Sequence, residues 1–368
     1  MKISISRQDL LEAVNKVKTI VSSKSALPIL SHILMEASES SVKLSATDLK
    51  VSIECSVDCT VHESGSLTVS SQRLASMLQE LPETDITLEL TESNVIALEC
   101  GQIHTKLFSM SPEEFPPIRS FEGVEPLVLP QKLLKKMFSK TSFAICSDQA
   151  RYNLTGLLFE INGGKLIAVA TDGRRMSLYS EEEGIPDGIS IKVIIPGKMI
   201  AELERLLSDD GDVSVFMDEA QAAFEFQAVR LVTALIEGNF PNYEMVVPKK
   251  HDKEVVLDTD RFIEAMRRTR TMTNEKFNSV RLVLNEGVLT LKVVTPEVGE
   301  YEEEMSIEYA GENAEIAFNP DFMLDVLRRL ESEKTLLALK DAGNPGVVKP
   351  HGVEGVADYV NVIMPIRI

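Results

Sequence analysis

The sequence has 368 residues, which is enough for two or three domains of ordinary size. It is 44% hydrophobic and 26% charged, as globular proteins are, and it contains no tryptophan on which bases could stack. The formal net charge of −19, taken alone, argues against a nucleic-acid partner, because phosphate groups would be repelled.

The chain opens with the alternating string MKISISRQDL, which lacks the apolar core of a signal peptide or membrane anchor. Apolar residues then recur at helical spacing and predict a helix over 7–23. The strand-like runs HILMEA and VKLSATDLKVSIE follow, and a second helix is predicted over 70–81. No later stretch approaches the ~18 consecutive apolar residues of a membrane span. We therefore expect a cytoplasmic protein without a membrane partner.

This order of elements returns twice along the chain. Helix-like segments begin again at 131–145 and 260–272, and second helices are predicted at 197–207 and 319–330. The tripeptide Ala-Thr-Asp at 46–48 also recurs at 170–172. Such a repeat is the feature that most constrains a fold, and its period is too long for a solenoid. The sequence predicts three tandem α+β domains, each with two helices packed on antiparallel sheets, at 1–125, 126–250 and 251–368.

Positive charge gathers on the helix-like segments. The segment 131–142 carries four lysines and no acid, and the six segments together are net basic while the remaining chain is strongly acidic. Such helices could face phosphate groups, in contacts that carry no sequence information and weaken with salt. The alternative is that the basic residues simply occupy solvated helix faces.

No motif indicates catalysis or metal binding. The chain has no P-loop, HExxH, nucleophile elbow or Rossmann glycine pattern, and its histidines are scattered. The cysteines are spread over the chain and are interpreted as ordinary thiols: Cys55, Cys59, Cys100 and Cys146. The two Ala-Thr-Asp strings are interpreted as strand-to-turn chemistry, with the aspartate accepting backbone hydrogen bonds. We expect no enzyme activity, no cofactor and no metal.

Seven strings, in order along the whole chain, carry a resemblance to a known family. They are LPILSHILMEA (27–37), LSATDLKVSIE (44–54), RYNLTGLLFE (151–160), VATDGRRMSLY (169–179), EGNFPNYEMVVP (237–248), NEKFNSVRL (274–282) and VIMPIRI (362–368). In this order and spacing they resemble the bacterial DNA sliding clamp, the beta subunit of DNA polymerase III.

The resemblance implies a ring-forming homodimer of three clamp-type domains per chain, closed head to tail around duplex DNA. The helices would line the hole and the sheets would form the outer wall. Closure would hold the DNA by topology rather than by affinity, which removes the conflict with the negative net charge. Such a ring confers processivity on a polymerase.

Two groups of residues are expected to face DNA. The resemblance implies Lys24, Arg73, Gln149 and Lys198. The charge pattern adds Lys135, Lys136, Arg267 and Arg268. For each basic residue, solvation of a helix surface is the alternative.

The resemblance also implies a hydrophobic pocket between the middle domain and the C-terminal tail. There the replicative polymerase, the clamp loader and repair proteins insert a short linear motif. The matching positions are Arg151, Leu154, Thr171, Gly173, Arg174, Met176, Pro241, Val246, Phe322, Ile363, Met364, Pro365 and Arg367. Methionine and aliphatic side chains suit a pocket with several clients. The alternative interpretation makes VIMPIRI a last edge strand packed in the core.

The chain departs from the family pattern at three places in this pocket. Arg174 stands where histidine is common, Phe322 where tyrosine is common, and Met245 where arginine is common. The preference among client peptides is therefore left open. The loop 341–351 aligns poorly and carries no assignment.

A dimer seam is expected between the first domain and the third domain of the partner copy. The seam residues are His104, Lys106 and Leu107 on a late strand of the first domain, and Glu300, Glu303 and Glu304 on a strand of the third. Strand pairing and the charge contrast would hold it. A protein-interaction scaffold without a DNA role is the rival hypothesis, which a monomer without DNA retention would favour.

Overall fold

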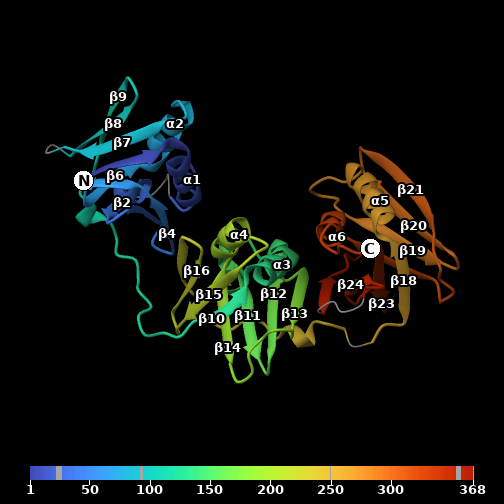
Figure 1. The fold of residues 1–368 in the computed structure, drawn as a ribbon. Helices are drawn as coiled ribbons and strands as arrows, with labels where there is room; N and C mark the ends of the chain where they lie inside the picture. The colour runs from blue at the N-terminus through green and yellow to red at the C-terminus, as the bar shows by residue number, and fades with distance from the viewer. Residues whose placement is uncertain (22–26, 92–93, 249, 354–357, 368) are drawn as a thin grey trace. The chain divides into compact units, whose positions relative to one another are not determined.

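The computed structural model describes residues 1–21, 27–91, 94–248, 250–353 and 358–367 (Figure 1). It divides into two compact units, Met1–Leu134 with Ala201–Leu235, and Lys135–Ile200 with Ile236–Ile368. The α-helices of the described residues are α1 (Arg7–Val17), α2 (Ser71–Glu80), α3 (Gln131–Thr141), α4 (Gly197–Leu206), α5 (Thr259–Thr271) and α6 (Pro320–Leu327). All six predicted helices are therefore present.

The first unit holds two antiparallel sheets. The smaller has the order β5 (Thr60–Glu63), β1 (Lys2–Ser6), β7 (Asp85–Leu90), β8 (Val95–Cys100), β9 (Ile103–Phe108). The larger has the order β10 (Leu127–Pro130), β15 (Asp212–Met217), β16 (Gln221–Phe226), β17 (Val229–Ala234), β4 (Val51–Asp58), β3 (Ser41–Thr47), β2 (His32–Ser38), β6 (Gly65–Ser70). Strand β17 pairs with β4, with Val229 opposite Cys55, so the larger sheet crosses from the first repeat into the second.

The second unit repeats this plan. Its larger sheet has the order β14 (Ile191–Pro196), β11 (Gly156–Asn162), β12 (Lys165–Thr171), β13 (Arg175–Glu181), β25 (Tyr359–Ile363), β24 (Gly346–His351), β23 (Lys334–Leu339), β18 (Lys253–Asp258). Its smaller sheet has the order β21 (Gly299–Ser306), β20 (Val288–Thr295), β19 (Val280–Asn285), β22 (Ala314–Phe318). Here β13 pairs with β25, and the sheet crosses from the second repeat into the third.

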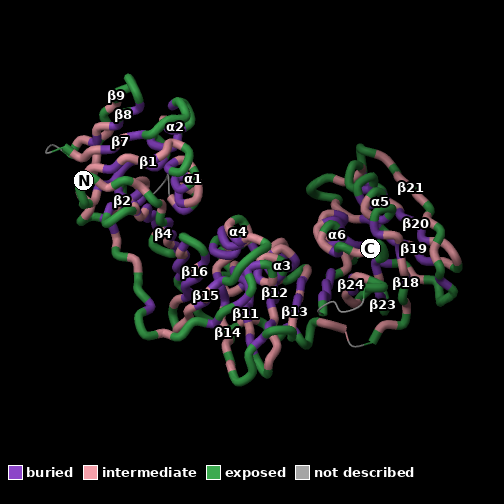
Figure 2. The backbone as a smooth tube through the Cα atoms, in the orientation of Figure 1, coloured by how far each residue is buried: buried purple, intermediate pink, exposed green. Residues whose placement is uncertain are grey.

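Helices pack on these sheets through one apolar face. Helix α1 buries Leu10, Val14 and Val17, packs on α2 and lies against β3 and β4. Helix α5 packs on α6 in the same way and buries Phe262. Figure 2 shows the buried residues running along the strands and the helix faces within each unit. Burial of these side chains is the main source of stability.

The first helix is shorter than predicted. It ends at Val17, and a turn follows although Val21 continues the helical spacing. Thr19, Ile20 and Val21 are all β-branched, which lowers helix propensity, and the side chain of Ile20 is fully buried beyond the helix end.

The two Ala-Thr-Asp strings form the same turn. Asp48 accepts hydrogen bonds from the backbone N–H groups of Lys50 and Val51, at 2.9 and 2.7 Å. Asp172 does the same for Arg174 and Arg175, at 2.8 and 3.0 Å. The interpretation of these strings as strand-to-turn chemistry is confirmed.

Candidate functional site

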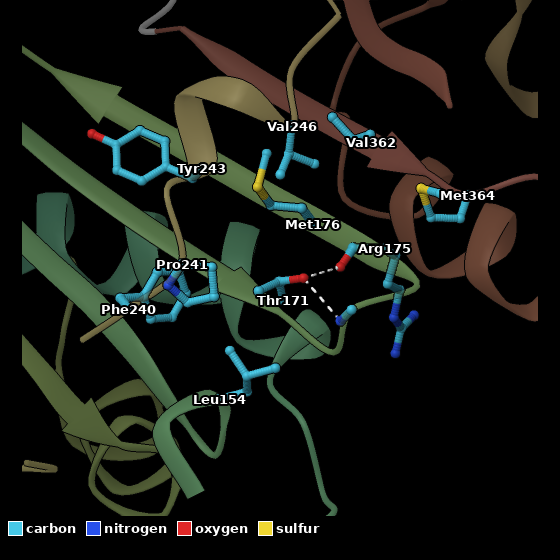
Figure 3. A pocket seen from close by; sticks show the side chains of 11 residues that line it. Leu154, Thr171, Arg175, Met176, Phe240, Pro241, Tyr243, Val246, Val362 and Met364 are labelled. Carbon is cyan, nitrogen blue, oxygen red and sulfur yellow. Dashed lines mark hydrogen bonds between the residues drawn. The ribbon is translucent and has the colours of Figure 1, made fainter. Parts of the chain in front are cut away.

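An apolar pocket of about 210 Å³ opens in the second unit (Figure 3). It is built from the 3-10 helix Gln149–Leu154, the turn from β12 to β13, the segment 240–246 and the end of β25. Its lining residues are Leu154, Thr171, Gly173, Arg175, Met176, Phe240, Pro241, Tyr243, Val246, Val362 and Met364. The structure thus brings together most of the apolar positions that the sequence predicted for this pocket.

Strand register sets the floor of the pocket. Met176 on β13 lies opposite Thr171 on β12 and opposite Val362 on β25, so the three side chains share one face of the sheet. Met176 and Val362 are 3% and 1% exposed and belong to a core cluster that also contains Leu158. The rim is open, because Val246 is 39% and Met364 is 41% exposed. The floor is therefore part of the hydrophobic core, while the rim is available to a ligand.

The turn at Gly173 shapes one wall. The Thr171 hydroxyl donates to the carbonyl of Arg175 at 2.7 Å and accepts from the N–H of Gly173 at 3.0 Å (Figure 3). Gly173 has φ +79°, and a Cβ there would lie 3.2 Å from Nη1 of Arg151. Arg151 itself donates to the Asp172 carbonyl and pairs with Asp148. Only glycine meets both conditions without strain.

Arg175 is a pocket residue that the sequence analysis missed. Its guanidinium pairs with Asp172 at 3.1 Å and with Asp325 at 2.6 Å, and donates to the Phe143 carbonyl at 2.7 Å. It also lies 4.5 Å from the ring centroid of Phe322. Phe322 is not among the lining residues, but its ring packs against Arg175, which is. Cation–π contact needs only the ring, so the tyrosine hydroxyl missing here is not required for it.

Three further lining residues were missed: Phe240, Tyr243 and Val362. Burial raises the pKa of Tyr243 to about 12, and its hydroxyl lies 3.5 Å from Glu160. The ring therefore stays neutral at ordinary pH. All three residues, and Arg175, lie within the strings that carry the family resemblance. That resemblance was the signal that could have identified them as pocket residues.

Several residues predicted for the pocket lie elsewhere. Ile363 is fully buried and, one position after Val362 on β25, points to the opposite face of the sheet. Exposed Arg151 and half-buried Phe322 and Pro365 are not part of the lining. Arg174 and Arg367 line a separate polar groove of about 560 Å³. The lining of this cavity does not include these residues, and their assignment to the peptide-binding pocket stays a prediction.

The C-terminal segment is not an edge strand. Strand β25 is interior, between β13 and β24. Beyond it, the N–H of Met364 donates to the Arg174 carbonyl and that of Ile366 to the Ala317 carbonyl, both at 2.8 Å. The segment after β25 is therefore pinned to the protein surface beside the pocket.

The residues expected to face DNA lie mostly on exposed helix surfaces. Arg73, Lys136, Lys198 and Arg267 are exposed on α2, α3, α4 and α5, Gln149 is exposed on its 3-10 helix, and Lys135 is half-buried. Lys24 lies outside the described residues. Arg268 is bound to Glu303 at 2.6 Å, which raises the pKa of Arg268 and lowers that of Glu303. Its charge is thus already paired within the chain.

The expected seam residues lie on two sheet-edge strands. Among the described residues, neither β9 nor β21 has a strand on its outer side. On β9, His104 lies 3.3 Å from Glu99, Lys106 is exposed and Leu107 is half-buried. On β21, Glu300 and Glu304 are exposed, whereas Glu303 is paired with Arg268.

In the part of the chain that the structure describes, no group of three or more His, Cys, Asp or Glu residues could hold a metal ion. Its helices are all too short or too polar to span a membrane.

Comparison with known proteins decides the family. Models of the DNA polymerase III beta subunit match as an N-terminal domain over 1–119, a central domain over 128–242 and a C-terminal domain over 244–367. The chain belongs to this family. The family resemblance and the fold class of three tandem clamp domains are confirmed, and the chain is a sliding clamp of DNA replication.

Individual relatives agree along the whole length. The beta sliding clamp of Chlamydia muridarum is 33% identical over 368 residues, covering 100% of this chain and 99% of the relative. The crystal structure of the beta subunit from Pseudomonas aeruginosa has a TM-score of 0.94 at 33% identity, covering 100% of both chains. A second structure from that organism, bound to griselimycin, has a TM-score of 0.95 at 33% identity, again covering 100% of both chains.

Proposed function

We propose that two copies of this chain close head to tail into a ring around duplex DNA, without catalytic activity or a cofactor, in the cytoplasm. The apolar pocket would tether the replicative polymerase, the clamp loader and repair proteins through short linear motifs. We also propose that the chain divides into three domains at 1–125, 126–250 and 251–368. The matched ranges of the three domain models support that division.

The main support for ring closure is that β9 and β21 are sheet edges without a neighbouring strand on their outer side in the described chain. Inside the chain, β4 pairs with β17 and β13 with β25 across successive repeats. By position in the repeat, β21 corresponds to β4 and β13, because each is the third strand after the first α-helix of its copy. Likewise β9 corresponds to β17 and β25. Pairing β21 of one copy with β9 of another would repeat the internal junction, and a second such pairing would close the ring.

Side-chain charge supports the same pairing. Glu300 and Glu304 are exposed acids on β21, and Lys106 is an exposed base on β9. Opposite charges across a seam set register and favour the correct partner more than they add affinity.

The basic helices support a DNA partner. Arg73, Lys136, Lys198 and Arg267 are exposed on four different helices of a chain whose net charge is −19. Phosphate contacts from such residues would be independent of sequence and weakened by salt. A closed ring needs no more than this, because topology prevents escape.

The pocket itself supports a peptide partner. Its floor is preformed by the core, and its rim exposes Val246 and Met364. An amphipathic short motif would bury apolar side chains there without first ordering the pocket. The Pseudomonas aeruginosa clamp with griselimycin bound is an example of a relative with a ligand.

The deciding experiment is retention of labelled protein on nicked circular DNA, with the cognate clamp loader and ATP, before and after the circle is cut. We expect retention in high salt on circles and its loss on linear DNA. Loader ATPase activity is measured in parallel as the control for an active loader. Equal, salt-sensitive retention on both forms would indicate an ordinary electrostatic DNA binder. No retention with an active loader would favour the scaffold hypothesis.

A further inference from the structure

The polar groove that contains Arg174 and Arg367 adjoins the apolar pocket. The N–H of Met364, a rim residue of the pocket, donates to the carbonyl of Arg174, and Ile366 and Arg367 continue from there into the groove. The pocket and the groove are therefore neighbours along the segment Met364–Arg367, and an extended peptide could reach from one into the other.

The groove has an excess of positive charge. Lys276, Arg174 and Arg367 line it and make no ion pair with any residue that the structure describes. Two more lining cations are already neutralised: Arg281 pairs with Glu315 at 2.8 Å, and Lys292 with Glu302 at 3.1 Å. Glu275 is the one acidic residue among the described lining.

We propose that this groove binds acidic side chains that flank the apolar motif of a client peptide. The inference rests on the proposed function of the pocket. Three cations that form no ion pair with the described residues, beside an apolar pocket, complement a peptide with apolar residues at one end and carboxylates at the other. The protein as a whole carries a charge of −19, and its acidic surfaces would repel such a peptide. The groove would therefore fix the direction in which a client enters.

Arg174 makes this a property of the present chain. It stands where the family commonly has histidine, and arginine remains charged at all physiological pH values whereas histidine is mostly neutral at neutral pH. Its planar guanidinium can also bind a carboxylate through two hydrogen bonds. The substitution adds a permanent anion-binding group at the junction of pocket and groove.

The test measures fluorescence polarisation with the full-length protein and labelled peptides. The peptides carry the clamp-binding segment of the same organism's replicative polymerase, extended at either end by three Glu or by three Gln residues. We expect the wild-type protein to bind one Glu-extended peptide about tenfold more tightly than its Gln-extended match, or ~1.4 kcal/mol. In the triple variant Arg174→Gln, Lys276→Gln, Arg367→Gln this ratio should fall to about one.

Matched variants separate the groove from general electrostatics. Lys132→Gln removes an exposed lysine of α3 that is outside both cavities, and should keep the tenfold ratio. Arg174→His should lower the ratio at pH 8 and restore part of it at pH 6, because the imidazole becomes protonated while the glutamates stay charged. Circular dichroism checks that each variant is folded.

The outcomes are distinguishable. Equal binding of Glu- and Gln-extended peptides by the wild-type protein would overturn the inference and leave the proposed pocket intact. Failure of every peptide to bind would overturn the proposed pocket function, and the inference with it. If a labelled single-stranded oligonucleotide bound the wild type but not the triple variant, and the peptides showed no preference, the groove would be a nucleic-acid site instead.

Discussion

Arg175 links the pocket wall to α6 through charge and through an aromatic ring. Its side chain is only 12% exposed, and it holds Asp172, which shapes the Gly173 turn, together with Asp325 of α6. Removal of one member of such a partly buried network leaves the others without partners, which costs more than the pairing itself contributes.

We therefore expect Arg175→Met to destabilise the second unit by about 2 kcal/mol and to weaken client-peptide binding. Arg328→Met is the matched control, because Arg328 is exposed and makes no ion pair in the described chain, and it should change stability by less than about 0.5 kcal/mol. Urea unfolding midpoints and peptide affinity measure both effects. Equal midpoints for the two variants would contradict the role given to Arg175.

At the scale of single elements, α5 depends on its N-terminal cap. The Asp258 carboxylate accepts from the backbone N–H of Arg261 at 3.1 Å, and this hydrogen bond holds the pKa of Asp258 below its usual value. A carboxyl whose pKa is lower in the folded protein than in the unfolded chain stabilises the fold above the unfolded pKa. This stability is lost as the pH falls through the folded pKa.

Asp258→Ala should therefore cost about 1 kcal/mol at pH 7, and the difference from the wild type should shrink below pH 4. Hydrogen exchange of the first-turn amides of α5 reports the change locally. Asp260→Ala, in the same turn but not at the cap, is the control and should have the smaller effect. A difference that stayed constant down to pH 3 would show that the carboxylate charge is not what stabilises the cap.

Helices, repeats and turns could be predicted because they depend on local patterns. Apolar spacing located all six helices, and the Asp48 and Asp172 turns follow from a side chain that reaches its own backbone. The pocket was only partly predictable. Whether Val362 or Ile363 faces it depends on the register in which β25 pairs with β13, and the role of Arg175 depends on Asp325, which is 150 positions away. Such long-range pairings leave no local signature.

On the scale of the whole molecule, the seam prediction needs one revision. Glu303 is paired with Arg268 in the same chain, so the exposed acids Glu300 and Glu304 are the better test of the seam.

We expect the double variant Glu300→Lys, Glu304→Lys to weaken the dimer about tenfold at low salt. The effect is limited to this size because exposed ion pairs contribute little individually. Analytical ultracentrifugation measures this. Adding Lys106→Glu should recover part of the loss, and a dimer indifferent to all three changes would rule out the charge contrast.

The pocket floor has a consequence for resistance to inhibitors. Met176 and Val362 belong to the hydrophobic core, so a substitution that reshapes the floor also loosens the sheet that contains it. A bacterium escaping a compound bound in this pocket would therefore have to change the rim, at positions such as Val246 and Met364. Under the proposed function those same side chains receive the polymerase, so each escape mutation would also weaken the cell's own replication contacts.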